Sequence, residues 1–224
     1  MNTRSDSLGA TIGNAGNGKT ALLKTASARL PTTWGEFWCH SFQSVVDGET
    51  HLAFVMGEVD IDEPVLVRVH SECVTGDVFN SVKCDCGLQL DEAMRRVAEA
   101  DQGVVVYLRG HEGRGIGISQ KLRAYQLQDQ GFDTVDANLE LGVAVDSRDY
   151  SVGAQILIDL GVSRLRLMTN NPAKYQGLEG FGLTISELVP LHVPIHPEAK
   201  RYIETKRGRL GHHTPDDPMN PTTE

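Results

Sequence analysis

The sequence predicts an α/β fold, because short apolar runs alternate with segments of helical periodicity through its middle. Residues 51–56 and 65–69 are rich in side chains that favour strands. Residues 104–108 are a continuous apolar run typical of a buried strand. Residues 165–168 predict a further short strand, and 181–189 are expected to be extended.

The helices between these runs are predicted from apolar spacing and from the glycines that end them. In 88–100 the apolar side chains from Leu90 to Ala98 share one helical face, and Gly103 follows. The other predicted helices are 118–130, which stops at Gly131, 150–160, which stops at Gly161, and the basic segment 197–209. A glycine-rich loop at 110–117 and a turn at 170–172, with a short helix after it, connect these elements.

Composition sets limits on the class of protein. The 224 residues leave room for one large domain or two small ones, and 40% hydrophobic with 23% charged residues is ordinary globular usage. The net charge of −9 excludes a global basic footprint for nucleic acid. No apolar run approaches the roughly 18 residues of a membrane span, and the polar N-terminus is no signal peptide. We therefore expect a soluble, cytoplasmic protein with neither a nucleic-acid nor a membrane partner.

The two ends of the chain are predicted to be tails around one folded domain. Residues 1–24 form a flexible N-terminal extension, 25–211 the domain, and 212–224 a flexible C-terminal tail. Within the extension, Gly13–Thr20 matches the phosphate-loop pattern GxxxxGK[ST]. That loop needs a buried strand before it and a helix after it, and no such strand precedes Gly13. We interpret the match as a chance feature of a Gly/Asn-rich tail.

Three of the four cysteines are spaced for a metal. Cys73 is followed after ten residues by Cys84-Asp85-Cys86, which is poor spacing for a disulfide framework. Zinc prefers such thiolates in tetrahedral geometry, with a fourth protein ligand in structural sites and a water in catalytic ones. Cys39, His40 or His70 could supply a fourth ligand, although Cys39 is expected to be an ordinary buried thiol. Spacing leaves a catalytic site, a structural site and free buried thiols all open.

Several motifs carry a family resemblance. They are RVHSECVTGD at 68–77, KCDCGLQ at 83–89, HEGRGIG at 111–117, KLRAY at 121–125, DTVDAN at 133–138, DSR at 146–148 and TNNP at 169–172. In these motifs and in their order, the chain resembles GTP cyclohydrolase II from about Leu30 to Gly211. The resemblance implies the fold of that family, an α/β fold with a mixed sheet packed with helices.

The resemblance also implies an activity. Enzymes of this family open the imidazole ring of GTP and release formate and pyrophosphate, the first step of riboflavin biosynthesis. The product is 2,5-diamino-6-ribosylamino-4(3H)-pyrimidinone 5′-phosphate. The family is homodimeric and uses one Zn²⁺ per chain, held by three cysteines and a water, together with Mg²⁺ at the triphosphate. Without a dihydroxybutanone-phosphate synthase half, this chain would be the monofunctional kind.

By resemblance, the metal ligands are Cys73, Cys84 and Cys86, which favours the open, catalytic kind of zinc site. Tyr125 matches a tyrosine of the zinc-centred water chemistry; otherwise it would be a helix residue packed on the core. Asp146 and Arg148 match an acid–base and nucleophile pair, in which Arg148 attacks the α-phosphorus. Because a guanidinium is normally protonated, that role requires Asp146 to accept its proton. Without the family, this pair would be a solvated surface ion pair.

The remaining matched positions are implied to bind GTP. They are Arg68, Val69 through its backbone, His70, Ser71, Glu72, Gln89, Glu112, Gly113, Arg114, Thr134, Thr169 and Lys174. Gln89 suits a purine edge because an amide offers both donors and an acceptor. Residues 109–123 hold four basic side chains and one acidic side chain, so this stretch can bind triphosphate within an acidic protein. Arg109 and His111 receive no role.

Two alternatives stay open beside full GTP ring opening. One is a specialised paralogue that stops at the formamide product or serves another pathway. The other is a non-catalytic module that binds zinc and nucleotide.

Overall fold

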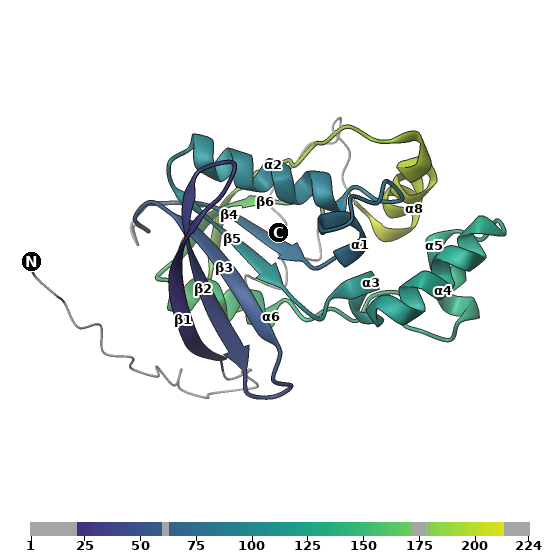
Figure 1. Ribbon diagram of the computed structural model, residues 1–224, viewed down its shortest axis with the longest axis horizontal. Helices are drawn as coiled ribbons and strands as arrows, with labels where there is room; N and C mark the ends of the chain where they lie inside the picture. Colours follow the sequence, from purple (N-terminus) through teal and green to yellow (C-terminus); the bar gives the residue numbers. More distant parts are fainter. Residues whose placement is uncertain (1–21, 60–62, 172–177, 179, 213–224) are drawn as a thin grey trace, which may run out of the picture.

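The computed structural model describes residues 22–59, 63–171, 178 and 180–212. Within them, seven strands form one sheet in the order β1-β2-β3-β5-β4-β6-β7 (Figure 1). The strands are β1 Leu22–Pro31, β2 Glu36–Ser44, β3 Thr50–Met56, β4 Val65–Ser71, β5 Gly103–Leu108, β6 Arg164–Met168 and β7 Thr184–Val189. The helical elements are α1 Val74–Asp77, α2 Cys86–Glu99, α3 Glu112–Gly115, α4 Gly117–Asp129, α5 Thr134–Glu140, α6 Ser151–Asp159, the 3₁₀ turn η1 Pro197–Ala199 and α8 Lys200–Leu210.

The sheet is mixed, as the sequence resemblance predicted. Strands β1, β2 and β3 form an antiparallel meander, and β3 pairs antiparallel with β5. Strands β5, β4, β6 and β7 are parallel neighbours. Parallel strands need crossovers that cover the sheet faces, and α2 and α6 lie on opposite faces (Figure 1).

Each face of the sheet carries its own part of the core. The larger cluster joins apolar residues of β3 to β7 with those of α6, including the fully buried Ile156 and Leu167. The smaller cluster packs α2, through Ala93 and Val97, against Val105 of β5 and its neighbours. The continuous apolar runs of β4 and β5 follow from this burial on both faces.

The C-terminal ends of the parallel strands face α1, α3, α4, α5 and α8 (Figure 1). Three connections leave the sheet at this edge, at Ser71 after β4, at Leu108 after β5 and at Met168 after β6. In open α/β sheets, ligands bind at the carboxyl ends of strands where neighbouring connections diverge. The fold therefore gathers the predicted motifs at one edge.

The structure confirms the α/β fold and most elements predicted from periodicity. The helices predicted at 88–100, 118–130 and 150–160 are α2, α4 and α6, with small shifts of their ends. The extended run predicted at 181–189 is a strand from Thr184. Within the described residues, no helix has the length and apolar character that a membrane crossing requires.

Sequence reasoning missed the hairpin of β1 and β2 and the short helix α5. The β1 side chains are mostly exposed, so this strand shows no apolar alternation, and it begins at Leu22, inside the predicted extension. Helix α5 had a readable signal in Asp133, whose carboxylate caps the helix by accepting from Val135 N and Asp136 N. The prediction that Cys39 is buried is wrong, because Cys39 lies on β2 and is partly exposed. The phosphate-loop lookalike, the short helix expected after 172 and residues 213–224 lie outside the described residues.

Leu167→Ala is expected to destabilise the fold by roughly 2–5 kcal/mol, because it leaves a cavity in the larger core cluster where Leu167 is fully buried. Urea unfolding followed by circular dichroism measures the free energy of unfolding. Leu139→Ala is the matched control: Leu139 is 59% exposed, and its change should stay within about 0.5 kcal/mol. Equal losses in the two variants would contradict this account of the core.

Candidate active site

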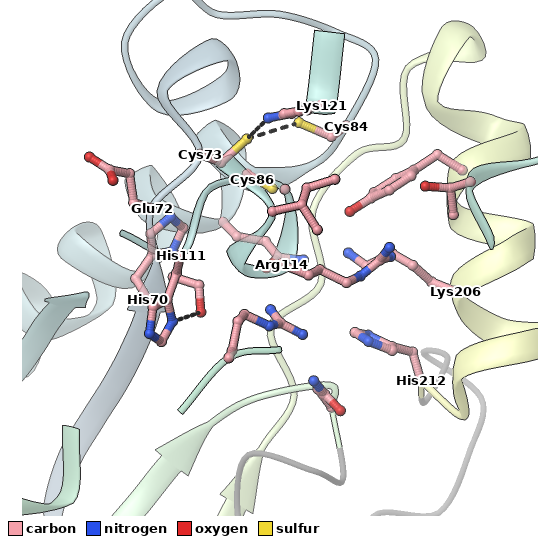
Figure 2. A pocket seen from close by; sticks show the side chains of 18 of the residues that line it. His70, Glu72, Cys73, Cys84, Cys86, His111, Arg114, Lys121, Lys206 and His212 are labelled. Carbon is pink, nitrogen blue, oxygen red and sulfur yellow. Dashed lines mark hydrogen bonds between the residues drawn. The ribbon is translucent and has the colours of Figure 1, made fainter. Parts of the chain in front are cut away.

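A cleft opens at the carboxyl edge of the parallel strands. Its empty space, counted to the open mouth, is about 940 Å³, which is within the size range of small-molecule sites. It is lined by the connections after β4, β5 and β6, by the start of α2, by α4 and α5, and by α8. Figure 2 shows the three cysteines and Lys121 at one end, with Lys206 and His212 across from His70 and Glu72.

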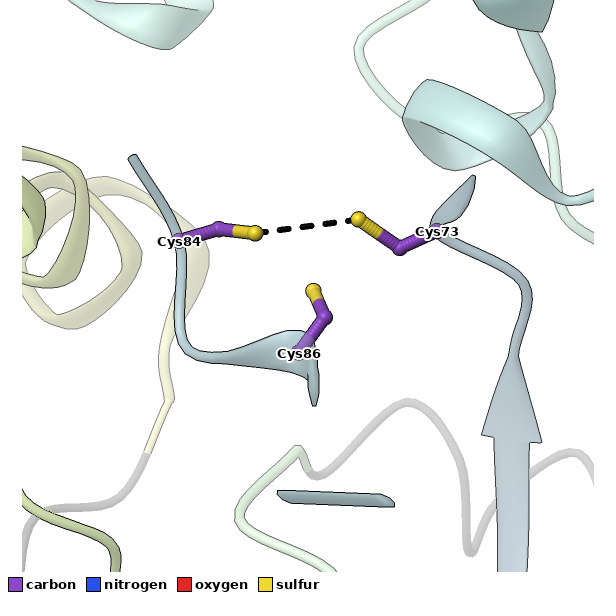
Figure 3. A group of neighbouring side chains, drawn as sticks. All are labelled: Cys73, Cys84 and Cys86. Atoms are coloured by element: carbon purple, nitrogen blue, oxygen red, sulfur yellow. Dashed lines mark hydrogen bonds between the residues drawn. The ribbon is translucent and has the colours of Figure 1, made fainter. Parts of the chain in front are cut away.

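The sulfur atoms of Cys73, Cys84 and Cys86 converge at that end (Figure 3). All three lie within 4.8 Å of one another, and the sulfurs of Cys73 and Cys84 are 3.7 Å apart. Zn–S bonds of about 2.3 Å in tetrahedral geometry place two sulfurs roughly 3.8 Å apart. The donor set and its spacing therefore fit zinc. The other candidate ligands are used elsewhere: the His40 ring contacts the Ser27 hydroxyl and His70 contacts Asp77.

Two glycines allow the ligand-bearing turns to approach each other. Cys73 is the N-cap residue of α1, and Cys86 is the first residue of α2. A Cβ built on Gly87 would lie 2.3 Å from the carbonyl oxygen of Gly76. A Cβ on Gly76 would lie 3.0 Å from Cys84 Sγ and 3.3 Å from Cys73 Sγ. The close packing of the two turns thus requires glycine at both positions.

A buried cation compensates the thiolates. Lys121 Nζ donates to Cys73 Sγ at 2.9 Å, to Thr75 Oγ1 at 2.7 Å and to Glu112 Oε1 at 2.5 Å. Hydrogen bonds from Cys84 and Cys86, and the Lys121 ammonium, hold the pKa of Cys73 far below its usual range. Although burial acts in the opposite direction, the Cys73 sulfur raises the pKa of Lys121. The cluster therefore favours a thiolate beside a charged lysine.

Asp77 holds the end of β4 and the turn that carries Cys73. Its carboxylate accepts from Cys73 N at 2.9 Å and from Tyr107 OH at 2.9 Å, and lies 3.1 Å from His70 Nε2. The His70 ring stacks on Tyr107. These contacts hold the turn of Cys73 against β5, so the position of this candidate metal ligand is fixed by the protein itself.

A chain of polar side chains crosses the cleft from β4 to α8. Arg68 Nη2 donates to Gln89 Oε1 at 2.8 Å, and Arg68 Nη1 donates to the Met168 carbonyl at 3.0 Å. Gln89 Nε2 donates to Asp85 Oδ2 at 2.7 Å, and Lys206 Nζ donates to Asp85 Oδ1 at 2.9 Å. Although burial acts in the opposite direction, the Lys206 ammonium holds the pKa of Asp85 below its usual range. Asp85 is thus a carboxylate that only accepts hydrogen bonds.

Positive charge gathers along the cleft. Among the described residues, its lining includes the cations Arg68, Arg114, Lys121, Arg148 and Lys206 against a single carboxylate, that of Glu72. Lys121, Arg148 and Lys206 each pair with an acid. No carboxylate of the described residues pairs with Arg68 or Arg114, and the buried Arg68 Nε and Arg114 Nη2 have no hydrogen-bond partner there. Buried cationic groups that lack a hydrogen-bond partner favour binding of an anionic ligand.

Asp146 and Arg148 form a tight pair at the rim. Arg148 Nε donates to Asp146 Oδ1 at 2.9 Å, and its Nη2 donates to Oδ2, so the contact is bidentate. Although burial opposes the effect, the hydrogen bonds to Asp146 raise the pKa of Arg148. Arg148 also lies over the Tyr150 ring, 5.4 Å from its centroid. The guanidinium is therefore charged and held in one orientation.

A family model described as GTP cyclohydrolase II matches residues 23–190 of this chain. The chain belongs to the GTP cyclohydrolase II family. A riboflavin biosynthesis protein RibBA of Salinispora tropica is 62% identical over 187 residues, which cover 84% of this chain and 47% of that protein. The monofunctional riboflavin biosynthesis protein RIBA 3 of Arabidopsis thaliana is 58% identical over 185 residues, covering 83% and 36%.

The rice protein described as probable monofunctional riboflavin biosynthesis protein RIBA 3 is 56% identical over 204 residues, covering 88% of this chain and 38% of that protein. The chain thus spans about half or less of the length of these relatives. The family match confirms the resemblance drawn from the motifs. Helix α8 lies beyond the matched residues.

The structure brings most predicted residues of this GTP cyclohydrolase II family member into the cleft. Those that line it are Arg68, His70, Ser71, Glu72, Cys73, Cys84, Cys86, Gln89, Gly113, Arg114, Tyr125, Thr134, Arg148 and Thr169. Three others do not line it. Val69 packs in the larger core cluster, Glu112 is buried against Val74 N and Lys121, and Asp146 lies behind Arg148. Lys174 lies outside the described residues.

Sequence reasoning missed several residues that line or shape the cleft of this family member. Lys121 was part of a quoted motif but received no role, although it contacts the candidate metal ligand Cys73. Tyr202, Lys206 and His212 line the cleft from α8 and the residue pair after it. The only signal for Tyr202 and Lys206 was the basic helix predicted at 197–209, which does not show where that helix packs, and His212 lies in the segment that was predicted to be a flexible tail. Arg109, which had no role, lies 3.7 Å from Glu72 in an ion pair.

Gly87→Ala is expected to weaken zinc binding at least tenfold, because the added Cβ would push the turn of Cys73 and Gly76 away from the turn of Cys84 and Cys86. Competition with a chromophoric chelator measures the dissociation constant. Gly208→Ala on α8 is the control, since a Cβ there meets nothing within 4 Å and alanine favours a helix. Unchanged zinc affinity in Gly87→Ala would show that the two turns need not pack closely.

Proposed function

We propose that this protein catalyses the GTP cyclohydrolase II reaction, opening the imidazole ring of GTP and releasing formate and pyrophosphate. The product is 2,5-diamino-6-ribosylamino-4(3H)-pyrimidinone 5′-phosphate, which places the protein at the first step of riboflavin biosynthesis. One observation carries the proposal. Three cysteine sulfurs with zinc spacing share a cleft with the buried Arg68 and the half-buried Arg114, neither of which has an acid partner among the described residues.

The reaction balances with water alone. One water adds to C8 and breaks the bond from C8 to N9, which leaves a formamide. A second water cleaves the formamide into formate and a free amine. A third water balances the release of pyrophosphate from the α-phosphorus, which leaves the 5′-phosphate. Neither an oxidant nor a reductant is needed.

Cys73, Cys84 and Cys86 would hold one Zn²⁺ per chain, with water as the fourth ligand. A bound zinc supplies a nucleophilic water at neutral pH and polarises the atom under attack. The chain's own residues set the surroundings. Lys121 offsets the negative charge of the thiolates, and burial raises the pKa of the Tyr125 phenol. Tyr125 therefore stays protonated and can donate a hydrogen bond or a proton at C8.

The cations on the cleft wall suit the triphosphate with its Mg²⁺. Arg68 and Arg114 would bind phosphate oxygens in place of the missing acid partners. Arg148 would meet the α-phosphate. For Arg148 to attack, its proton must pass to Asp146, which already accepts from it at 2.9 Å. A bond from nitrogen to phosphorus then forms as the bond to the pyrophosphate oxygen breaks, and water later cleaves the nitrogen–phosphorus bond.

In this proposal Gln89 reads the base, and Thr134 and Thr169 contact GTP through their hydroxyls. His70, Ser71 and Glu72 contact the nucleotide from the cleft wall, and Val69 contributes through its backbone. Lys174, Gly113 and Glu112 complete the set of predicted GTP residues, Glu112 acting through Lys121 and the turn at Val74. We further propose that the protein works as a homodimer in the cytoplasm. The decisive experiment is metal analysis combined with product identification: one zinc per chain, with formate and pyrophosphate from GTP, is expected.

Cys84→Ser is expected to lower ring opening by at least about a hundredfold while the protein stays folded, because the site is catalytic and the fold has a large core of its own. Product analysis and zinc content measure the loss, and circular dichroism monitors the fold. Cys39→Ser, at the partly exposed cysteine of β2, should keep both activity and zinc. Unfolding of Cys84→Ser would instead indicate a structural metal and favour the non-catalytic alternative.

Tyr125→Phe is expected to reduce formate release by about a hundredfold and pyrophosphate release much less, because it removes the phenol that serves the C8 chemistry. Separate assays of formate and pyrophosphate per GTP give the ratio. A wild-type protein that yields pyrophosphate without formate would favour the paralogue that stops at the formamide. Parallel loss of both products in Tyr125→Phe would show that Tyr125 acts in packing or binding.

A further inference from the structure

Helix α8 is connected to Gln89, the proposed reader of the base, through a series of hydrogen bonds. Lys206 on α8 donates to Asp85, Asp85 accepts from the Gln89 amide, and the Gln89 oxygen accepts from Arg68. The exposed fractions of Lys206, Asp85 and Arg68 are 9%, 8% and 4%, so solvent competes little with these contacts. Helix α8 lies beyond the residues that match the family model.

These hydrogen bonds fix the positions of the oxygen and the nitrogen of the Gln89 amide. Arg68 can only donate and the Asp85 carboxylate can only accept, so a rotation of the amide by 180° would break both hydrogen bonds. The amide keeps one N–H and one oxygen lone pair beyond these contacts, each at a fixed end. A side chain held in this way presents a donor and an acceptor in one order only.

That order separates guanine from adenine. Guanine presents an acceptor at O6 beside a donor at N1, whereas adenine presents a donor at N6 beside an acceptor at N1. An amide that can rotate pairs with either edge, and an amide that cannot rotate pairs with one. Sites that hydrogen-bond a polar edge in a fixed geometry reject the mismatched edge strongly, since buried polar groups are left unpaired.

We propose that Lys206 is a specificity-determining positioning residue, which holds Asp85 and thereby fixes the Gln89 amide in the order that accepts guanine and rejects adenine. This rests on the proposed function in placing a purine nucleotide in the cleft with its base edge against Gln89. Lys206 acts through other residues and sits over the Tyr202 ring, 4.9 Å from its centroid.

The charges explain why removing Lys206 would free the amide. Arg68 Nε is buried without a hydrogen-bond partner in the described part of the chain. Asp85, once released from the Lys206 ammonium, has Arg68 as the cation toward which it can turn. Its carboxylate would then leave Gln89 Nε2, and the amide could rotate. The effect should fall on base discrimination more than on phosphate binding.

The test compares the dissociation constants of the α,β-methylene analogues of 7-deaza-GTP and 7-deaza-ATP, which cannot release pyrophosphate, on the zinc-loaded protein with Mg²⁺. Both probes keep the base edge at positions 1 and 6, and neither can be opened at C8, because carbon replaces N7. Lys206→Met is expected to shrink the preference for the guanine probe by roughly 10- to 100-fold. Lys206→Arg should restore most of it, because arginine can still donate to Asp85.

Arg209→Met is the matched control on the same helix. Arg209 anchors α8 through Asp133 and Asp136 and does not line the cleft, so its loss should leave the preference unchanged. An equal drop in Arg209→Met and Lys206→Met would overturn the proposal, as would Lys206→Met weakening both probes by the same factor. Should Lys206→Met fail to fold, Asp85→Asn replaces it, because the amide can both donate and accept and no longer fixes Gln89.

Failure of the proposal and failure of the proposed function are distinguishable. A wild-type protein that prefers the guanine probe without opening GTP would overturn the reaction alone. A wild-type protein that opens GTP and binds the two probes equally would overturn the role of Lys206 alone.

Discussion

The parallel pairing of β4 with both β5 and β6 is the constraint on which the rest of the structure depends. It brings three connections to one edge of the sheet, and each carries a different part of the site. The connection after β4 holds Cys73, the connection after β5 holds Arg114, and the connection after β6 holds Thr169. Because strand ends in a sheet lie about 4.8 Å apart, side chains distant in the sequence meet within one cleft. The antiparallel hairpin of β1 and β2 lies at the far end of the strand order and supplies no residue to the cleft lining.

Charge is distributed in two ways in this acidic protein. Lys121, Lys206 and Arg148 carry acid partners, which keep buried cations in place when no ligand is bound. Arg68 and Arg114 lack such partners in the described residues, so their charge is available to an anion. The paired cations stabilise the walls of the cleft, whereas Arg68 and Arg114 are suited to bind an anionic ligand. A net charge of −9 therefore says little about the local potential that a triphosphate would meet.

Sequence reasoning reached the family, the α/β fold and the cysteine cluster because each rests on local pattern. Apolar periodicity marks elements that are buried, which is why α2 and β5 were predicted while the exposed β1 was not. The motifs located the cleft but not the direction of each side chain: Val69 and Glu112 share motifs with cleft residues yet face the core and Lys121. Contacts such as that of Lys206 with Asp85, 121 positions apart, depend on how α8 docks, and no local pattern encodes that distance.

The segment Cys84-Asp85-Cys86 links the cysteine cluster to Gln89 within three residues. Its two sulfurs belong to the candidate metal site, while the carboxylate between them accepts from Gln89 and from Lys206. Neighbouring side chains on one short turn cannot move independently, so a shift of the sulfurs also shifts the carboxylate. A bound zinc that orders the turn would thus also order the Gln89 amide. In the proposed function, metal binding and base reading would then both depend on one turn, which is held from β4 by Arg68 through Gln89 and from α8 by Lys206.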